Sequence, residues 1–246
     1  MLVVVSPAKK LDMDPVAGVQ PTQPMFPERT RELVTEAAKL TSGELEKLMK
    51  ISPNLAKLNQ QRFSDFGSQD RKPAAFAFAG DTFQGLEVAT LDADALRWAQ
   101  EHLRILSGLY GVLRPLDEIE PYRLEMGSRL KTEHGKNLYE YWGSELALEL
   151  STQAKTTKST AVINCASQEY FQAVDTRSLA VPVISPVFME NTEKGPKIIS
   201  FYAKRARGAM ARFVVSNRIA TPAELCDFEA GGYRYEPDLS SENKPV

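Results

Sequence analysis

Six basic residues and no acidic residue lie between Lys197 and Arg218. On a helix over residues 203–217, at ~100° per residue, the apolar side chains fall on one arc. Arg207 then lies about 80° from the centre of that arc, so it is either paired or directed into a cleft. This pattern predicts an anion site at Arg205 and Arg207, with the remaining arginines of the stretch on a solvated face.

A second predicted strand end carries similar chemistry. Val4–Lys10 reads Val-Val-Ser-Pro-Ala-Lys-Lys, and Ile198–Arg205 reads Ile-Ile-Ser-Phe-Tyr-Ala-Lys-Arg. Each is a strand, a serine, and then alanine, lysine and a further basic residue. Strand ends of an α/β sheet gather at one edge, where backbone N–H groups, hydroxyls and lysines can hold phosphate. We therefore predict that Lys9, Lys10 and Lys204 join the anion site.

Polar side chains follow two further predicted strands. One group is Asn164, Ser167, Glu169 and Tyr170, and the other is Arg114, Asp117, Tyr122, Arg123 and Glu125. If these groups converge, Glu169 or Asp117 could act as an acid or base in a pocket. Ser6 and Asn164 would then orient a substrate, and Arg123 and Arg205 would hold its anion. The alternative is that these side chains form structural salt bridges and turn caps.

The segment from Leu45 to Leu58 predicts two short helices joined by a tight turn. It resembles the helix-hairpin-helix of DNA-repair proteins, in which a turn presents backbone N–H groups to a DNA phosphate. Four residues would make this contact: Ser52, Pro53, Asn54 and Leu55. The turn contains no glycine, unlike the usual motif, and a helical hairpin packed on the core remains the alternative.

The common nucleotide, hydrolase and metalloprotease signatures are absent. Cys165 follows a predicted strand, but no histidine is near it in sequence, and we interpret it as a small buried residue. His102 and His134 show no metal-ligand spacing, and we interpret both as surface or structural residues. With only two cysteines and two histidines, we expect neither a structural zinc site nor a cofactor.

The elements that position these residues alternate along the chain. We predict strands at 2–5, 74–78, 103–106, 160–164, 181–188 and 197–202. We predict helices at 30–39, 42–49, from 52, 92–101, 137–150 and 203–217. This order indicates one α/β or α+β domain over residues 1–246, with a mixed sheet, a helical hairpin at about 42–60 and a frayed polar tail at 240–246.

The composition is that of a globular protein. The 246 residues are 43% hydrophobic and 25% charged, which excludes a disordered or disulfide-stapled chain. The net charge of −2 gives no global basic excess, so a nucleic-acid site must be a local patch. No segment approaches the ~20 apolar residues of a membrane span. We expect a cytoplasmic monomer that binds no membrane.

Seven blocks of the sequence together resemble one known family. They are S-P-A-K-K at 6–10, G-D-T-F-Q-G-L at 80–86, L-R-I-L-S-G-L-Y-G-V-L-R-P-L-D at 103–117, P-Y-R-L-E-M-G at 121–127, K-N-L-Y at 136–139, A-S-Q-E-Y-F at 166–171 and K-I-I-S-F-Y-A-K-R-A-R-G at 197–208. They occur in the order found in the bacterial peroxide stress resistance family YaaA. The resemblance implies a cytoplasmic protein that limits DNA damage under hydrogen peroxide and is linked to lower free intracellular iron. It also implies a family-specific single-domain fold with a basic cleft and a helix-hairpin-helix that bind double-stranded DNA.

The residues and the resemblance together support three hypotheses. The first is a protein that grips the backbone of double-stranded DNA with Lys9, Lys10, Lys204, Arg205 and Arg207, assisted by the hairpin turn. The second is an enzyme acting on a nucleotide or damaged base in the same cleft. The third is iron binding through carboxylates alone, which the scarcity of histidine and cysteine disfavours.

Overall fold

The computed structural model describes residues 1–246. Its main sheet has the strand order β4-β3-β1-β6-β7. The strands are β1 (Leu2–Val5), β3 (Leu103–Ser107), β4 (Gly111–Leu113), β6 (Val162–Cys165) and β7 (Val183–Ile184). β1, β3, β6 and β7 are parallel, and β4 pairs antiparallel with β3 at one edge. The predicted mixed sheet of an α/β domain is confirmed.

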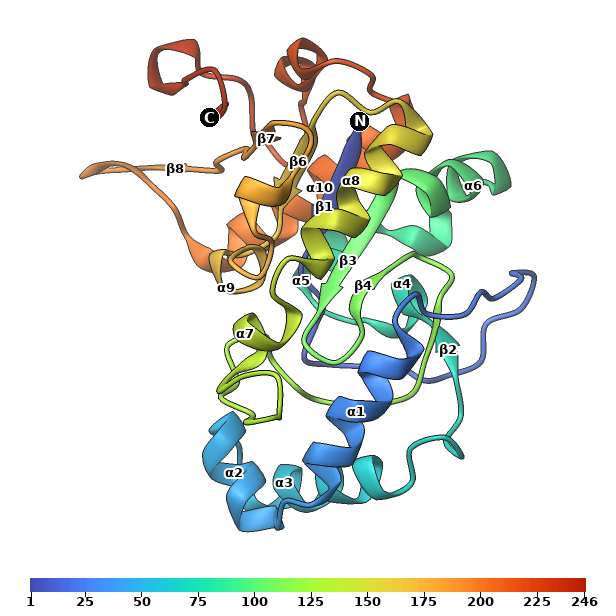
Figure 1. Ribbon diagram of the computed structural model, residues 1–246. Coiled ribbons are helices and arrows are strands. Elements are labelled where there is room, and N and C mark those ends of the chain that lie inside the picture. Colours follow the sequence, from blue (N-terminus) through green and yellow to red (C-terminus); the bar gives the residue numbers. More distant parts are fainter.

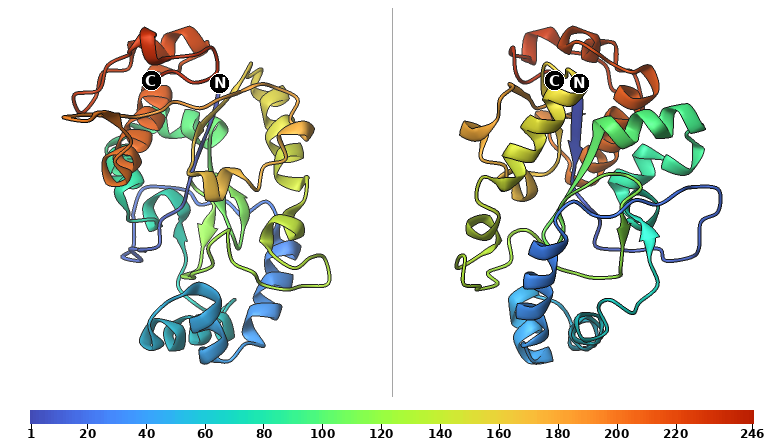
Figure 2. Two further views of the ribbon diagram at one scale, coloured as in Figure 1. Left: turned by 90° about the vertical axis from the view of Figure 1, so that its left-hand side faces the viewer. Right: turned by 45° about the vertical axis from the view of Figure 1, so that its right-hand side comes forward.

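β1 lies at the centre of the sheet, as its run of apolar residues requires. Its four residues are fully buried, with β3 on one side and β6 on the other. Helix α10 (Ser200–Asn217) covers one face of the sheet, and α8 (Glu145–Thr157) covers the other (Figures 1 and 2). One continuous hydrophobic core of 59 buried residues joins these layers, so the chain forms a single compact domain.

The remaining helices surround this framework. They are α1 (Pro27–Ala38), α2 (Ser42–Met49), α3 (Pro53–Ser64), α4 (Ala74–Ala77), α5 (Asp81–Leu86), α6 (Ala93–His102), α7 (Leu138–Trp142) and α9 (Gln168–Phe171). Short 3-10 turns lie at Val88–Thr90, Thr176–Ser178, Pro222–Asp227 and Pro237–Leu239. Two small sheets pair β2 (Lys72–Pro73) with β5 (Glu118–Ile119), and β8 (Glu190–Thr192) with β9 (Gly195–Lys197). No helix is both long and apolar enough to cross a membrane.

Several predicted elements differ from the structure. The predicted strand at 74–78 is the short helix α4, because a run of four or five apolar residues does not distinguish strand from buried helix. The predicted helix at 137–150 is broken into α7 and α8 at Gly143, whose φ of 49° departs from helical geometry. The predicted strand at 197–202 is wrong, because α10 already begins at Ser200.

The polar tail also differs from the prediction. The backbone carbonyls of Asn243 and Pro245 accept hydrogen bonds from the N–H groups of Ser185 and Val187, at 2.9 and 2.8 Å. The tail therefore lies against the segment that follows β7 instead of fraying.

Candidate functional site

A polar cavity of about 280 Å³ lies at the carboxyl ends of β1 and β6. In the sheet, β3 lies on one side of β1, whereas β6 and then β7 lie on the other side. The connections that follow β1 and β6 therefore run in opposite directions along the sheet. Such a switch point opens a crevice where α/β proteins bind ligands. Helices α5 and α10 contribute further walls. We call this cavity the cleft, and its polar lining is Ser6, Lys9, Lys10, Asp81, Thr82, Ser167, Glu169, Tyr170, Lys204 and Arg207.

The cleft brings together most of the residues predicted from the two strand ends. All three predicted lysines and Arg207 line it, as do four polar residues predicted for the pocket, namely Ser6, Ser167, Glu169 and Tyr170. Sequence reasoning missed Asp81 and Thr82 as site residues. They open α5 directly after Gly80, within the G-D-T block that carried the family resemblance.

Two serines tie the loops of the cleft together. The Ser167 backbone N–H donates to Ser6 Oγ at 2.8 Å, and Ser6 Oγ donates to Ser167 Oγ at 3.2 Å. The loops after β1 and β6 therefore hold a fixed separation, which positions the groups that line the cleft before any ligand binds.

Positive charge predominates in the cleft. Of its four cations, Lys9 makes an ion pair with Glu125 at 3.4 Å, whereas Lys10, Lys204 and Arg207 have no carboxylate within ion-pair distance. Asp81 and Glu169 are the acidic residues in the lining. Glu169 Oε1 accepts from the Gly127 N–H at 3.1 Å, and the Tyr139 hydroxyl donates to the Glu169 carbonyl at 2.9 Å.

The position of α10 depends on a close contact with α5. A Cβ added at Gly208 would lie 1.8 Å from the Thr82 carbonyl oxygen, and one at Gly85 would lie 2.0 Å from the Arg205 carbonyl oxygen. The two helices therefore touch backbone to backbone. This contact sets the distance between Thr82 on α5 and the two cations of α10, Lys204 and Arg207.

Arg207 also lines a second cavity of about 460 Å³. Its other polar residues are Asn164, Gln168, Gln172, Ser185 and Lys244. Asn164 was predicted for the pocket and lies here instead of in the cleft. Its carboxamide donates to Ser185 Oγ at 3.2 Å and accepts from the Ala166 N–H at 3.0 Å, so its orientation is fixed.

The structure separates Arg205 from Arg207. Arg205 lines a different groove of about 730 Å³, which it shares with Tyr202 and Arg212. Arg212 donates to the carbonyls of Leu86 and Glu87 at 3.1 and 2.9 Å. Adjacent positions on a helix point about 100° apart, which places Lys204 and Arg205 in different grooves.

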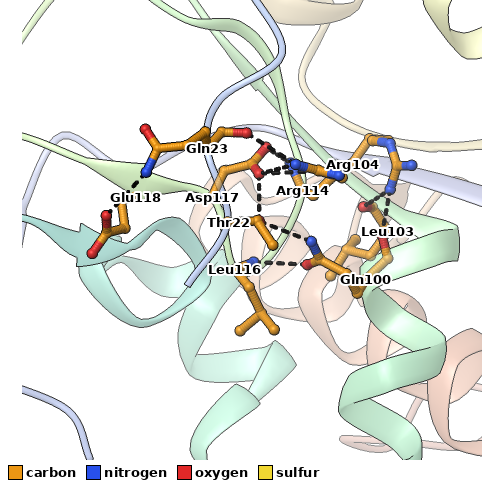
Figure 3. Close-up of polar contacts among 9 residues, drawn as sticks. All are labelled: Thr22, Gln23, Gln100, Leu103, Arg104, Arg114, Leu116, Asp117 and Glu118. Carbon is orange, nitrogen blue, oxygen red and sulfur yellow. Dashed lines mark hydrogen bonds and ion pairs between the residues drawn. The ribbon is translucent and has the colours of Figure 1, made fainter. Parts of the chain in front are cut away.

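Asp117 and Arg123 lie outside the cleft. Asp117 is fully buried and accepts from Thr22 Oγ1 at 2.6 Å, from the Arg114 N–H at 2.8 Å and from the Arg114 guanidinium at 2.8 and 3.0 Å (Figure 3). These bonds tie the connector that contains Thr22 to the turn after β4. Arg123 donates to Glu125 Oε1 at 2.9 Å. Both residues thus have the salt-bridge and turn-cap geometry that was the alternative interpretation.

A buried cation lies beside this network. Arg104 is 1% exposed and donates to the Gln100 and Leu103 carbonyls at 2.9 and 2.8 Å (Figure 3). Burial, together with the nearby Arg114 charge, lowers the pKa of Arg104 to about 10. The side chain of Gln100 in turn donates to Thr22 Oγ1 at 3.0 Å and accepts from the Leu116 N–H at 2.9 Å.

Cys165 and Tyr170 are buried at the base of the cleft. Burial raises the pKa of the Cys165 thiol to about 12, and the charge of Arg207 opposes this only in part. Burial also raises the pKa of Tyr170 well above its usual value. A thiol that stays protonated at neutral pH is a poor nucleophile, in agreement with the interpretation of Cys165 as a small buried residue.

The predicted helical hairpin consists of α2 and α3. Thr41 and Glu44 form a capping box at the start of α2, and Lys50 ends it in the left-handed conformation, with a φ of 52°. Ser52 then caps α3 by accepting from the Leu55 N–H at 3.4 Å. The hairpin lies at the end of the molecule remote from the two termini and α10 (Figures 1 and 2).

No three histidine, cysteine, aspartate or glutamate side chains gather closely enough to hold a metal ion. The groups that the structure does bring together at one edge of the sheet are cations, hydroxyls and carboxamides, with the two carboxylates of Asp81 and Glu169. Such a set can bind an anion attached to a polar, uncharged group.

Comparison with known proteins gives consistent matches over the whole chain. The family model described as "Peroxide stress protein YaaA" matches residues 1–239. The chain is 55% identical to a UPF0246 protein of Ruegeria pomeroyi and 56% identical to one of Roseobacter denitrificans, with 100% of this chain and 97% of each relative covered. A UPF0246 protein of Phenylobacterium zucineum is 52% identical, with 99% of this chain and 93% of the relative covered.

Proposed function

Because this chain belongs to the peroxide stress protein YaaA family, we propose that it is a DNA-binding protein of the peroxide response. In this proposal it acts in the cytoplasm, limits DNA damage under hydrogen peroxide and is linked to lower free intracellular iron. Its partner is the backbone of double-stranded DNA, which the cleft contacts through phosphate groups.

The observation that carries the proposal is the convergence of four cations in one cleft of a chain whose net charge is −2. Lys9 and Lys10 follow β1, and Lys204 and Arg207 lie on α10. Three of these four cations have no carboxylate partner, so their charge is available to an external anion. Lysine and arginine contacts to phosphate supply most of the affinity of sequence-independent DNA binding.

Exposed aromatic side chains on the helix that carries Lys204 and Arg207 add to this picture. Phe201 and Tyr202, in the first turn of α10, are 55% and 51% exposed. Large exposed rings next to cations are typical of nucleic-acid-binding surfaces, because bases and sugars pack against them. No helix resembles one that reads the major groove, and we therefore expect little sequence preference.

The hairpin is proposed as a second phosphate contact. Pro53 has no N–H and the Leu55 N–H is already bonded to Ser52 Oγ, which leaves the Ser52 and Asn54 N–H groups as the free donors of the turn. Lys50 and Lys57 supply positive charge nearby. Since the hairpin and α10 lie at different ends of the molecule, this contact would be made to a different part of the duplex.

The experiment is the affinity for a short duplex, measured by fluorescence anisotropy over a salt series. Each phosphate neutralised adds roughly 0.9 to the slope of log affinity against log salt. We expect Lys204→Ala/Arg207→Ala to flatten the slope by about 1.8, equivalent to two contacts. Arg205→Ala is the matched control, because it removes one charge from the same helix in the other groove.

Three outcomes are informative. A flatter slope for the double variant and an unchanged slope for Arg205→Ala would support the cleft as the DNA site. A loss in Arg205→Ala alone would move the site to the other groove. An unchanged slope in both variants, or no measurable DNA binding by the native protein, would refute the proposal.

A second candidate function is an enzyme that acts on a nucleotide or damaged base, and one observation favours it. Glu169 lines the cleft beside the cations, and its Oε2 has no hydrogen-bond partner in the protein. A carboxylate placed beside an anion site is more than phosphate binding requires, and it could move a proton. Glu169→Gln should then keep DNA affinity but lose protection of cells against peroxide. Full protection by this variant would exclude the enzyme.

A further inference from the structure

The two cavities at the carboxyl edge of the sheet are separated by one segment of chain. Residues 164–169 run between them, with Cys165, Ser167 and Glu169 lining the cleft and Asn164, Ala166 and Gln168 lining the second cavity. Successive side chains of an extended segment point to opposite sides, which explains the alternation from Asn164 to Ser167, and α9 continues it from Gln168 because adjacent helical positions point about 100° apart. The two cavities are therefore neighbours, and Arg207 lines both.

The two cavities differ in chemistry. The cleft has four cations and two carboxylates, those of Asp81 and Glu169. The second cavity has the cations Arg207 and Lys244, and it adds three carboxamides and a ring, contributed by Asn164, Gln168, Gln172 and Phe171. No acidic residue lines the second cavity. Both cavities can therefore attract an anion, and only the second also has carboxamides that suit a planar group that both donates and accepts hydrogen bonds.

The carboxamides remain available to a ligand. The side chains of Gln168 and Gln172 have no hydrogen-bond partner within the protein, and their spacing of four residues places them on the same side of the turn that includes α9. Asn164 is held by Ser185 and the Ala166 N–H, yet its amide retains one free hydrogen and one free lone pair. Carboxamides of this kind pair in two-point fashion with the edges of nucleobases.

From this arrangement, we propose that the two cavities form a site for a single unpaired nucleotide unit, with its phosphate in the cleft at Lys204 and Arg207 and its base in the second cavity at Gln168 and Gln172. Phe171 provides a ring on which the base can stack. The phosphate half rests on the proposed function of the cleft, whereas the base half rests on the second cavity alone. The unit is either a free nucleoside monophosphate or an unpaired nucleotide within DNA.

The experiment compares ligands that differ by one part, using the full chain and isothermal titration calorimetry. The probes are the four nucleoside 5′-monophosphates, ribose 5-phosphate and inorganic phosphate. Two-point hydrogen bonding of the carboxamides to the base predicts that at least one nucleoside monophosphate binds about tenfold more tightly than ribose 5-phosphate. Gln168→Ala/Gln172→Ala should abolish this difference and leave the affinity for ribose 5-phosphate unchanged.

Gln84→Ala is the matched control, since Gln84 is an exposed carboxamide in the Arg205 groove. A second arm compares a paired duplex with the same duplex carrying one unpaired nucleotide. A gain of about tenfold for the unpaired form, lost in the double glutamine variant, assigns the site to DNA. A gain seen only with free monophosphates assigns it to the free nucleotide.

The inference is overturned if neither arm shows a base-dependent gain that requires Gln168 and Gln172. This failure differs from failure of the proposed function. If duplex DNA and ribose 5-phosphate still bind, the cleft remains a phosphate site and only the base half is wrong. If the native protein binds neither DNA nor any phosphate ester, both proposals fall.

Discussion

Gly208→Ala tests how the contact between α5 and α10 shapes the cleft. The added Cβ would lie 1.8 Å from the Thr82 carbonyl oxygen, whereas real Cβ contacts are essentially never shorter than 3.0 Å. The helices would therefore have to separate by at least about 1.2 Å. The obstacle is a backbone atom, so no side chain can rotate out of the way.

The expected magnitude follows from two opposing effects. Overpacking costs about 1–3 kcal/mol, and a clash of backbone against Cβ belongs at the upper end of that range. Alanine gains about 1 kcal/mol over glycine in helix propensity. The net loss in the free energy of unfolding is then about 2 kcal/mol, which for a chain of this length lowers the Tm by roughly 4–8 °C.

The assay is urea unfolding together with thermal unfolding, with Gly43→Ala as the control. Gly43 lies in α2, and a Cβ there would meet no atom within 4 Å, so this variant should be neutral or stabilised by up to about 1 kcal/mol. Thr82 also lines the cleft, so Gly208→Ala should weaken duplex binding in addition. If Gly208→Ala were as stable as the native protein, the inferred backbone contact would be wrong.

Three further experiments, two of them with variants, probe the buried polar groups. Asp117→Ala leaves the Arg114 guanidinium without its carboxylate and should lower the free energy of unfolding in urea by about 3–5 kcal/mol. The salt slope of DNA binding should stay unchanged. An altered slope would mean that Asp117 belongs to the DNA site after all. Iodoacetamide at pH 8 should modify Cys226 well before Cys165, because burial raises the pKa of Cys165 to about 12. Equal rates of alkylation at the two cysteines, measured by mass spectrometry, would contradict this. Burial lowers the pKa of His102 below 6.5, so the unfolded chain takes up the proton first as the pH falls. Stability should therefore decrease from pH 7 to 5.5, and His102→Gln should show a smaller decrease.

The strand ends were the most predictable part of this molecule. Apolar runs bounded by proline or polar residues identified β1, β3 and β6, and parallel strands bring their carboxyl ends to one edge. For this reason Lys9 and Lys204, nearly 200 residues apart in the sequence, could be assigned to one site before the structure was considered.

Side-chain direction was less predictable. The sequence assigned Arg205 and Arg207 to one anion site, but α5 packs against α10 between their two grooves and separates them. The structural role of Asp117 could not be predicted either, because its hydrogen-bond partner Thr22 comes from a connector with no regular structure. The second cavity was missed because the sequence does not show that Gln168 and Gln172 lie beside Arg207, which comes from a distant part of the chain.

The central position of β1 has a consequence for synthesis on the ribosome. β1 ends at Val5, but its partner strands begin at Leu103 and Val162. At 5–20 residues per second, the Leu-Val-Val-Val segment therefore waits roughly 5–20 s for its first partner and longer for its second. During that interval an apolar strand with two open edges is exposed in the nascent chain, as a substrate for chaperones and a starting point for aggregation. The demand for folding assistance is thus set by the order of the strands in the gene, independently of how stable the finished protein is.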